Sequence, residues 1–240
     1  MPDISFNLQT AFITLVVVMA LLFIIALHRA GERFESKQTS LRWLALAITL
    51  MVVWLGSSAL IAQSGVLAEF DRRPPPIMLM AASFFLATTI LAFSPVGTRL
   101  INGIGIGWLI GFQVFRIPLE IWLHKLYLAG VIPVQMTYAG RNYDIFTGIL
   151  ALLLCLWAMF RQPPRSLIWL FNLVGFALLV NIVSIAILSA PTPFRRFFNE
   201  PANTFVAYSP YVWLPAFLVQ AAWFGHLLVF RWLRRRPTRF

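Results

Sequence analysis

The sequence predicts an all-α protein, a polytopic membrane bundle of about seven transmembrane helices that forms one domain over residues 1–240. Three observations support this prediction. The chain has 240 residues, of which 60% are hydrophobic and 11% are charged, and its mean hydropathy is +0.82. Apolar runs of membrane length recur along the whole chain, and proline-rich breaks separate several of them. A soluble domain of this size cannot bury so much apolar surface in one core.

Each predicted span is an apolar window close to the length that a membrane requires, which is about 20 residues for a helix. The windows cover approximately residues 8–27, 41–62, 77–93, 101–122, 145–160, 167–190 and 211–233. The third and fifth are short, so their ends must extend into flanking residues. The breaks "DRRPPP", "RQPPR" and "SAPTPF" follow the second, fifth and sixth spans. Proline lacks a backbone N–H donor and ends helices, so these breaks mark the connections.

The orientation follows from Lys and Arg, which are retained in cytoplasmic loops. With the amino terminus outside, the inner segments hold twelve of them: Arg29, Arg33, Lys37, Arg42, Arg99, Arg161, Arg165, Arg231, Arg234, Arg235, Arg236 and Arg239. The outer segments hold six: Arg72, Arg73, Lys125, Arg141, Arg195 and Arg196. This asymmetry predicts an outer amino terminus and a cytoplasmic carboxyl terminus. The first ten residues contain no Lys or Arg, which favours a retained first helix over a signal peptide.

Composition also limits the partners and cofactors. The formal net charge is +11, and much of it lies in the tail "RWLRRRPTRF". We expect this tail to contact anionic lipid headgroups of the bilayer, and we expect no nucleic-acid partner. Cys155 is the only cysteine, so no intrachain disulfide can form. A retinal protein needs a lysine in its last helix for the Schiff base. The two lysines, Lys37 and Lys125, lie outside the last span, which excludes a retinal protein. The three histidines are scattered, so we predict no metal site and no cofactor.

A polar stripe interrupts the fourth predicted span, in the segment "GFQVFRIPLEIWLHKLYLAG" at residues 111–130. The uncharged run before Arg116 is too short to cross hydrocarbon about 30 Å thick, so the span must continue past this residue. At about 100° per residue, Gln113, Arg116, Glu120 and His124 fall within an arc of roughly 80°. An ionised side chain inside the bilayer costs about 2.5–3.5 kcal/mol. The stripe therefore indicates either a functional polar site or an internal Arg116–Glu120 ion pair that only joins helices.

The loop after this span, "VIPVQMTYAGRNYDIFTG", adds polar residues on the same predicted outer side. Asn142 or Asp144 can cap the next helix, and Asp144 is equally suited to a binding site. Arg141 is either an interface anchor or the partner of an acidic side chain or of an anionic ligand. Asn181 in the sixth span should lie near the depth of Arg116, where the default role of an asparagine is to bond a neighbouring helix. The predicted binding residues are Arg116, Glu120, Arg141, Asn142, Asp144 and Asn181, and no catalytic residue is assigned.

Several segments resemble a family of uncharacterised bacterial multi-pass membrane proteins. They are "FRIPLE", "QMTYAGRNYDIFTGILA", "NIVSIAILSAPTPF" and "EPANTFVAYSPYVWLPAF". They match the family's Arg-x-Pro-x-Glu, Met-Thr-x-x-Gly-Arg-Asn-x-Asp and Pro-x-x-Trp-Leu-Pro blocks, over approximately residues 111–230. Ala139 stands where the family's Met-Thr block has a glutamate, so no role can rest on that position. The resemblance implies a bacterial inner membrane and supplies no activity.

Three functions fit these residues. The leading hypothesis is an inner-membrane protein with an outward-facing polar cavity that binds a small solute or a lipid headgroup, for transport or sensing. The first alternative is an intramembrane enzyme acting on a lipid or isoprenoid, with Glu120 or Asp144 as general base. The second is a structural assembly protein whose charges join helices. His226, in the inner part of the last span, is interpreted as a structural hydrogen-bonding residue.

Overall fold

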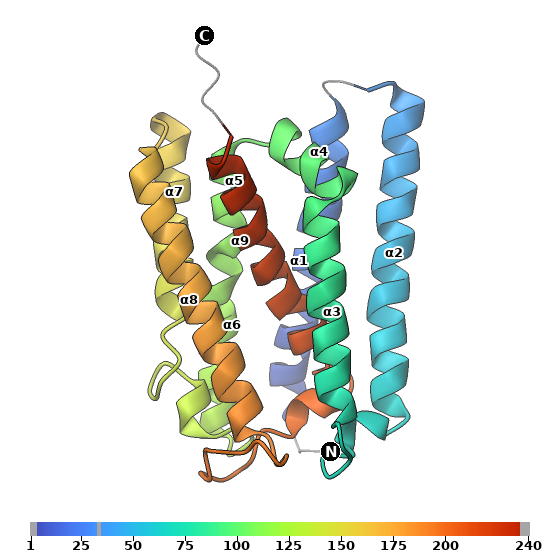
Figure 1. Cartoon of the computed structure of the whole chain (residues 1–240), viewed down its shortest axis with the longest axis vertical. Helices are drawn as coiled ribbons and strands as arrows, with labels where there is room; N and C mark the ends of the chain where they lie inside the picture. Colours follow the sequence, from blue (N-terminus) through green and yellow to red (C-terminus); the bar gives the residue numbers. More distant parts are fainter. Residues whose placement is uncertain (1–3, 33–34, 236–240) are drawn as a thin grey trace.

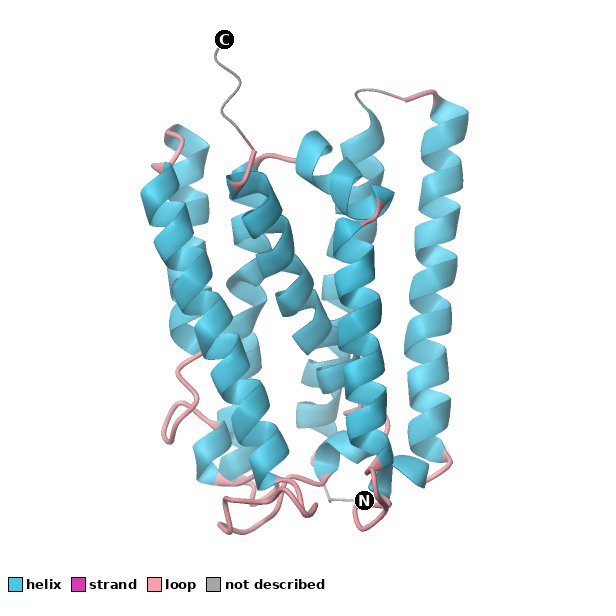
Figure 2. Ribbon diagram, in the orientation of Figure 1, coloured by secondary structure: helices cyan, strands magenta, loops and turns pink. Residues whose placement is uncertain are grey.

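The computed structural model describes residues 4–32 and 35–235, which form helices and connecting loops (Figures 1 and 2). The main helices are α1 (Phe6–Glu32), α2 (Lys37–Gln63), α3 (Pro76–Phe93), α4 (Pro95–Gly103), α5 (Ile106–Gly111), α6 (Arg116–Leu128), α7 (Ile145–Phe160), α8 (Arg165–Ser189) and α9 (Val219–Leu233). Short 3₁₀ segments are η1 (Val66–Ala68), η2 (Phe112–Phe115), η3 (Val134–Met136) and η4 (Phe205–Ala207). A π-helical segment, η5 (Leu214–Leu218), leads directly into α9.

In the described part of the chain, six helical segments are long and apolar enough to cross a membrane, so the chain is a multi-pass membrane protein. They are Phe6–Gly31, Lys37–Gln63, Pro76–Phe93, Ile106–Leu128, Arg165–Ser189 and Leu214–Leu233. The seventh predicted span corresponds to α7, which has only 16 residues. At 1.5 Å per residue it is about 24 Å long, less than the hydrocarbon thickness of about 30 Å. Helix length and hydropathy thus support six of the seven predicted spans.

The fourth span lies later in the chain than the predicted residues 101–122. Ser94 caps α4, its hydroxyl accepting from the N–H of Val96, and α4 ends before Ile104, whose backbone is extended. The span itself begins at Ile106 and continues to Leu128 through α5, η2 and α6. A Cβ on Gly103 would lie 2.2 Å from the carbonyl oxygen of Ala30, so the end of α4 packs against α1 without room for a side chain.

The helices stand side by side, with α1 beginning at one end of the bundle and α9 ending at the other (Figure 1). These ends are called the N-side and the C-side below. Helix α9 is central, because α3, α5 and α8 all pack against it, whereas α2 lies at the periphery against α1. Buried apolar side chains form one cluster toward the N-side, around Phe12, Trp122 and Tyr211. A second cluster lies toward the C-side.

The loop between α6 and α7 runs back along the bundle from the N-side, with Asn142 and Asp144 buried. Gly130, with φ of +70°, ends α6 in the left-handed conformation that glycine adopts without strain. After η3 the chain runs toward the C-side, so that α7 begins partway between the two ends of the bundle (Figure 2). Non-helical backbone at membrane depth occurs where it is buried in protein or lines a cavity. This loop occupies part of the length of the bundle. It therefore explains why α7 is short and why this helix begins between the two ends of the bundle.

Candidate functional site

Arg116 lies at the centre of a buried polar cluster. It is the eleventh of 23 residues in the Ile106–Leu128 span, and its side chain is 1% exposed. Its Nε donates to Oε1 of Gln113 at 3.1 Å, and its Nη1 forms an ion pair with Asp144 and donates to the carbonyl of Gly175 at 3.5 Å. Its Nη2 lies 3.2 Å from Nε2 of His226. Arginine carries five N–H donors, so most of its donors are engaged by protein acceptors.

Asp144 is the ion-pair partner of Arg116, in place of the Glu120 partner that one interpretation of the sequence assumed. The α6–α7 loop places Asp144 directly before α7, where the positive end of the helix dipole favours a carboxylate. Its Oδ1 also accepts from the Thr147 hydroxyl at 3.1 Å. The pair is buried on both sides, with the Asp144 side chain 6% exposed. Mutual compensation of this kind is what allows two charges inside a bundle.

Asn142 connects Glu120 to the rest of the cluster. Its Nδ2 donates to Oε2 of Glu120 at 2.6 Å and to the carbonyl of Met136 at 3.1 Å, and its Oδ1 accepts from the N–H of Asp144. Glu120 is 1% exposed. Among the described residues, hydrogen bonds reach one oxygen of each carboxylate, Oε2 of Glu120 and Oδ1 of Asp144. The other oxygen of each is left free for a further partner.

His226 on α9 is part of the cluster, which the sequence interpretation did not predict. Its Nδ1 lies 2.8 Å from Oδ1 of Asn172, whose Nδ2 donates to the carbonyl of His226 at 3.2 Å. The Asn172 oxygen can only accept, so Nδ1 carries the hydrogen and Nε2 keeps a lone pair. That lone pair accepts from Arg116. The imidazole is therefore a neutral acceptor that orients the guanidinium.

Three glycines, one on each of α7, α8 and α9, provide the space for these side chains. A Cβ on Gly175 would lie 2.7 Å from Cε1 of His226, and one on Gly225 would lie 2.4 Å from Nε2 of Gln113. On Gly148 it would lie 3.3 Å from Cβ of Arg116 and 2.9 Å from the backbone of Ile117. Small residues at these positions let the helices approach closely around the polar groups.

The cluster forms part of the wall of a cavity of about 350 Å³. Its lining residues come mainly from α3, α6, α8 and the η5–α9 segment. Among them, Arg116, Glu120, Asp144 and Asn203 are polar, and the others are apolar. The cavity extends toward the N-side as far as Ile77 and Ala190.

We infer from its exposed lining residues that the cavity opens between α3 and α8. Ala82 on α3 and Ile187 on α8 both line the cavity and are both exposed. Both belong to membrane-length helices, so this opening faces the surroundings of the bundle at membrane depth. The C-side of the cluster is closed by buried apolar residues of α7, α8 and α9, among them Leu154, Phe171 and Leu228.

Arg141 and Asn181 lie outside the buried cluster. Arg141 is exposed, and its guanidinium carbon lies 5.3 Å from the ring centroid of Phe197, an arrangement typical of a cation–π contact. Asn181 is half-buried and donates to the carbonyl of Arg141 at 2.9 Å. The structure therefore brings together four of the six predicted site residues: Arg116, Glu120, Asn142 and Asp144.

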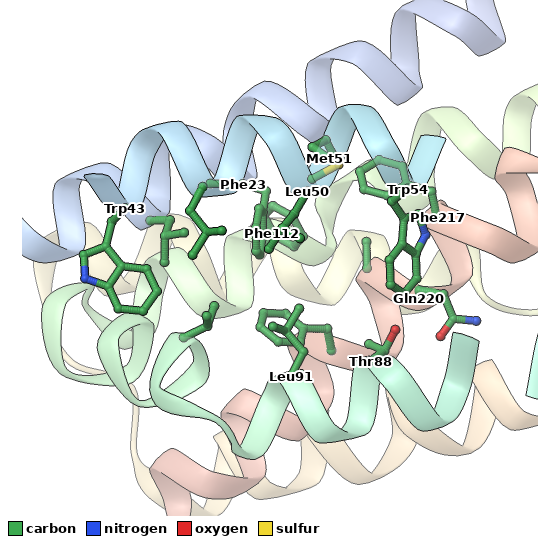
Figure 3. Close-up of a pocket in the computed structure, with 16 residues that line it drawn as sticks. Phe23, Trp43, Leu50, Met51, Trp54, Thr88, Leu91, Phe112, Phe217 and Gln220 are labelled. Atoms are coloured by element: carbon green, nitrogen blue, oxygen red, sulfur yellow. The ribbon is translucent and has the colours of Figure 1, made fainter. Parts of the chain in front are cut away.

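Two other hollows differ in chemistry. A pocket of about 110 Å³ lies between α1, α2, α3 and α9, with Trp43 at one end and Trp54 and Gln220 at the other (Figure 3). Its lining residues include no charged side chain. A wide recess of about 780 Å³ at the C-side contains the Arg99–Glu35 ion pair. In the described part of the chain, no group of three or more His, Cys, Asp or Glu side chains is placed to hold a metal ion.

Comparison with known proteins identifies a family. Residues 75–234 match the family described as "Domain of unknown function (DUF8737)". The match covers α3 to α9 and therefore all residues of the buried cluster, whereas α1 and α2 precede it. The chain shows no significant similarity to a curated protein or to a solved structure. Since the match covers more than half of its residues, this chain belongs to the DUF8737 family.

Proposed function

We propose that this protein binds a lipid-like amphiphile inside the membrane, for transport or for sensing. The apolar chain of the ligand lies between α3 and α8, and its polar head meets the cluster of Arg116, Glu120 and Asp144. The site faces the outer leaflet of a bacterial inner membrane, with the amino terminus outside. An amphiphile fits this cavity better than a small polar solute, because apolar side chains make up most of the walls.

The observation that carries this proposal is the composition of the 350 Å³ cavity. Ligand sites of about 300–1,000 Å³ are mostly apolar, with a few polar groups that fix the orientation of the ligand. Here the polar groups gather where the cavity meets α6 and the start of α7, and the exposed opening lies between two membrane-length helices. Ionisable residues inside a membrane are costly and mark functional sites. The apolar layer on the C-side supports entry and exit on the N-side.

Native mass spectrometry of protein purified in a mild detergent tests the proposal. We expect a co-purified amphiphile on the wild-type protein and its loss in Ala82→Phe, which places a large side chain at the opening. Ala177→Phe is the matched control, because Ala177 is an exposed alanine on α8 that does not line the cavity. Equal occupancy in both variants, or an empty wild-type protein that also fails to bind added lipids, would overturn the proposal.

An intramembrane enzyme acting on a lipid or isoprenoid is the second candidate. The observation in its favour is the carboxyl oxygen of Glu120 that has no hydrogen-bond partner in the described chain and belongs to a cavity-lining residue. A carboxylate in this position can act as a general base. Incubation of the detergent-purified protein with membrane lipid extract, followed by lipid mass spectrometry, separates the two candidates. Chemical conversion that Glu120→Gln abolishes would favour the enzyme, and unchanged lipids would favour binding.

A further inference from the structure

We infer that the polar head of the bound amphiphile is a hydrogen-bond-donating cation, such as a primary ammonium group. This inference rests on the proposed function and names its ligand class. The argument begins with the charges in the cluster. One guanidinium, Arg116, faces two carboxyl groups, Glu120 and Asp144, and His226 is a neutral acceptor. With one positive and two negative groups, the fully ionised cluster has a formal charge of −1.

When both carboxyl groups are ionised, the uncompensated negative charge is buried and lies toward Glu120. The ion pair between Arg116 and Asp144 is compensated. Within the described residues, Glu120 receives a single hydrogen bond, from the amide of Asn142, and its side chain forms no ion pair. Leaving a buried charge without a partner is strongly unfavourable. A cationic ligand head adjacent to Glu120 removes that penalty, whereas an anionic head increases it.

The hydrogen-bonding groups of the site point to the same ligand chemistry. Arg116 uses Nε, Nη1 and Nη2 on four protein acceptors, which leaves little donor capacity for an anion. The two carboxylates still have acceptor capacity, because Oε1 of Glu120 and Oδ2 of Asp144 have no hydrogen-bond partner in the described chain. Both residues line the cavity. An ammonium group has three N–H donors and no acceptor, so it matches a site of free acceptors.

The remaining polar lining residue does not change this conclusion. Asn203 is uncharged and donates through Nδ2 to the carbonyl of Ala186. Arg141 in the α6–α7 loop is exposed, does not line the cavity and contacts Phe197. The cavity therefore contains one guanidinium, already paired, and an apolar surface for a single hydrocarbon chain.

Three probes with the same chain test the inference: dodecylammonium, 1-dodecanol and dodecanoate. Each is titrated below its micelle-forming concentration into the protein in a non-ionic detergent, and the apparent Kd is measured from the thermal shift. We expect dodecylammonium to bind at least about tenfold more tightly than dodecanol, and dodecanoate to bind most weakly, because a hydrogen bond to a charged group contributes more than a neutral one.

Glu120→Gln keeps the size of the side chain and the acceptor for Asn142 but removes the charge. We expect this variant to lose the roughly tenfold preference for dodecylammonium over dodecanol. Glu200→Gln is the control, because Glu200 lies in an exposed loop outside the cavity. The order of the three probes on the wild-type protein decides the question even if Glu120→Gln does not fold.

The outcomes separate the two proposals. Tighter binding of dodecanoate, equal binding of the three probes, or an ammonium preference that persists in Glu120→Gln would overturn the cationic head and leave the amphiphile site intact. Failure of all three probes to bind, together with an empty purified protein, would overturn the proposed function itself. Ala82→Phe should weaken the binding of all three probes, which distinguishes the cavity from partition into the detergent.

Discussion

Burying the charged side chain of Arg116 costs free energy, and this side chain forms hydrogen bonds to several segments of the bundle. The Arg116 side chain is almost fully buried, and it contacts Gln113 of η2, Asp144 directly before α7, Gly175 of α8 and His226 of α9. A charge at this depth is tolerated only with a complete set of partners. Changing any one partner should therefore affect the whole cluster rather than a single bond.

A double-mutant cycle on Arg116 and Asp144 measures their coupling. We expect Arg116→Leu and Asp144→Leu each to destabilise the protein by about 3–5 kcal/mol, because each leaves an uncompensated buried charge. The double variant should lose less than the sum of the two single losses. Denaturant-induced unfolding in detergent micelles, followed by tryptophan fluorescence, provides the free energies. Strict additivity would show that the ion pair does not couple the two residues.

Gly175 provides a second test at the scale of one residue. Gly175→Ala should destabilise by about 1–3 kcal/mol through overpacking, because the new Cβ would lie 2.7 Å from Cε1 of His226. Gly56→Ala on α2 is the matched control, since a Cβ there meets no atom within 4 Å and alanine is favoured in helices. The midpoint of thermal unfolding should fall for Gly175→Ala and stay level or rise for Gly56→Ala. A fall of equal size in both variants would contradict the crowding around His226.

At the scale of elements, two irregular segments on the N-side determine the site. The α6–α7 loop carries Asn142 and Asp144 into the bundle, where they meet α6. The loop after α8 is held partly by Glu200, which accepts from Nη2 of Arg195 and from the N–H of Ala202, both at 2.8 Å. The first segment supplies charge to the site, and the second supplies Asn203 to the wall of the cavity.

The Glu200 contacts should depend on pH. The hydrogen bond from Arg195 is the main cause that lowers the pKa of Glu200 below its ordinary value of 4.5. A carboxyl group with a depressed pKa in the folded state stabilises its contacts above its ordinary value and loses this effect as pH falls through the lowered value. Hydrogen exchange at the Ala202 amide should therefore be slower in the wild type than in Glu200→Gln near neutral pH.

The difference in exchange between the two proteins should disappear on acidification, once Glu200 is protonated. A rate difference that remains constant from neutral to strongly acidic pH would show that the carboxylate does not protect the Ala202 amide. Because Glu200 is exposed, this effect should be confined to the loop. Amides in the middle of α8 should exchange alike in both proteins at every pH and serve as the internal control.

At the scale of the whole molecule, the proposed orientation decides which leaflet supplies the ligand. A Cys155→Ser background removes the single native thiol. Asn199→Cys then reports on the N-side and Gln38→Cys on the C-side, and both native residues are exposed. We expect a membrane-impermeant maleimide to label the first in intact cells and the second only after permeabilisation, following the excess of Lys and Arg on the C-side. The reverse pattern would invert the proposed topology.

The all-α class and the membrane-length helices of this chain follow from its sequence alone. Continuous apolar runs require helices in a bilayer, because the backbone must satisfy its own hydrogen bonds there. The length of a membrane span predicted that the fourth span continues through Arg116 and towards Glu120. The fourth span was predicted too early, because the run from Gly103 to Gly107 appeared as part of one apolar helix, whereas the structure breaks it at Ile104.

Which polar groups meet depends on the packing of the helices in three dimensions. Periodicity along one helix pairs Arg116 with Glu120, but the α6–α7 loop brings in Asp144 from 28 residues away and α9 brings in His226 from 110 residues away. The walls of the cavity likewise come from helices that are distant in sequence. Helical periodicity reports which side of a helix a residue occupies, whereas contacts between helices depend on how the bundle packs, and a single sequence contains no direct signal of that packing.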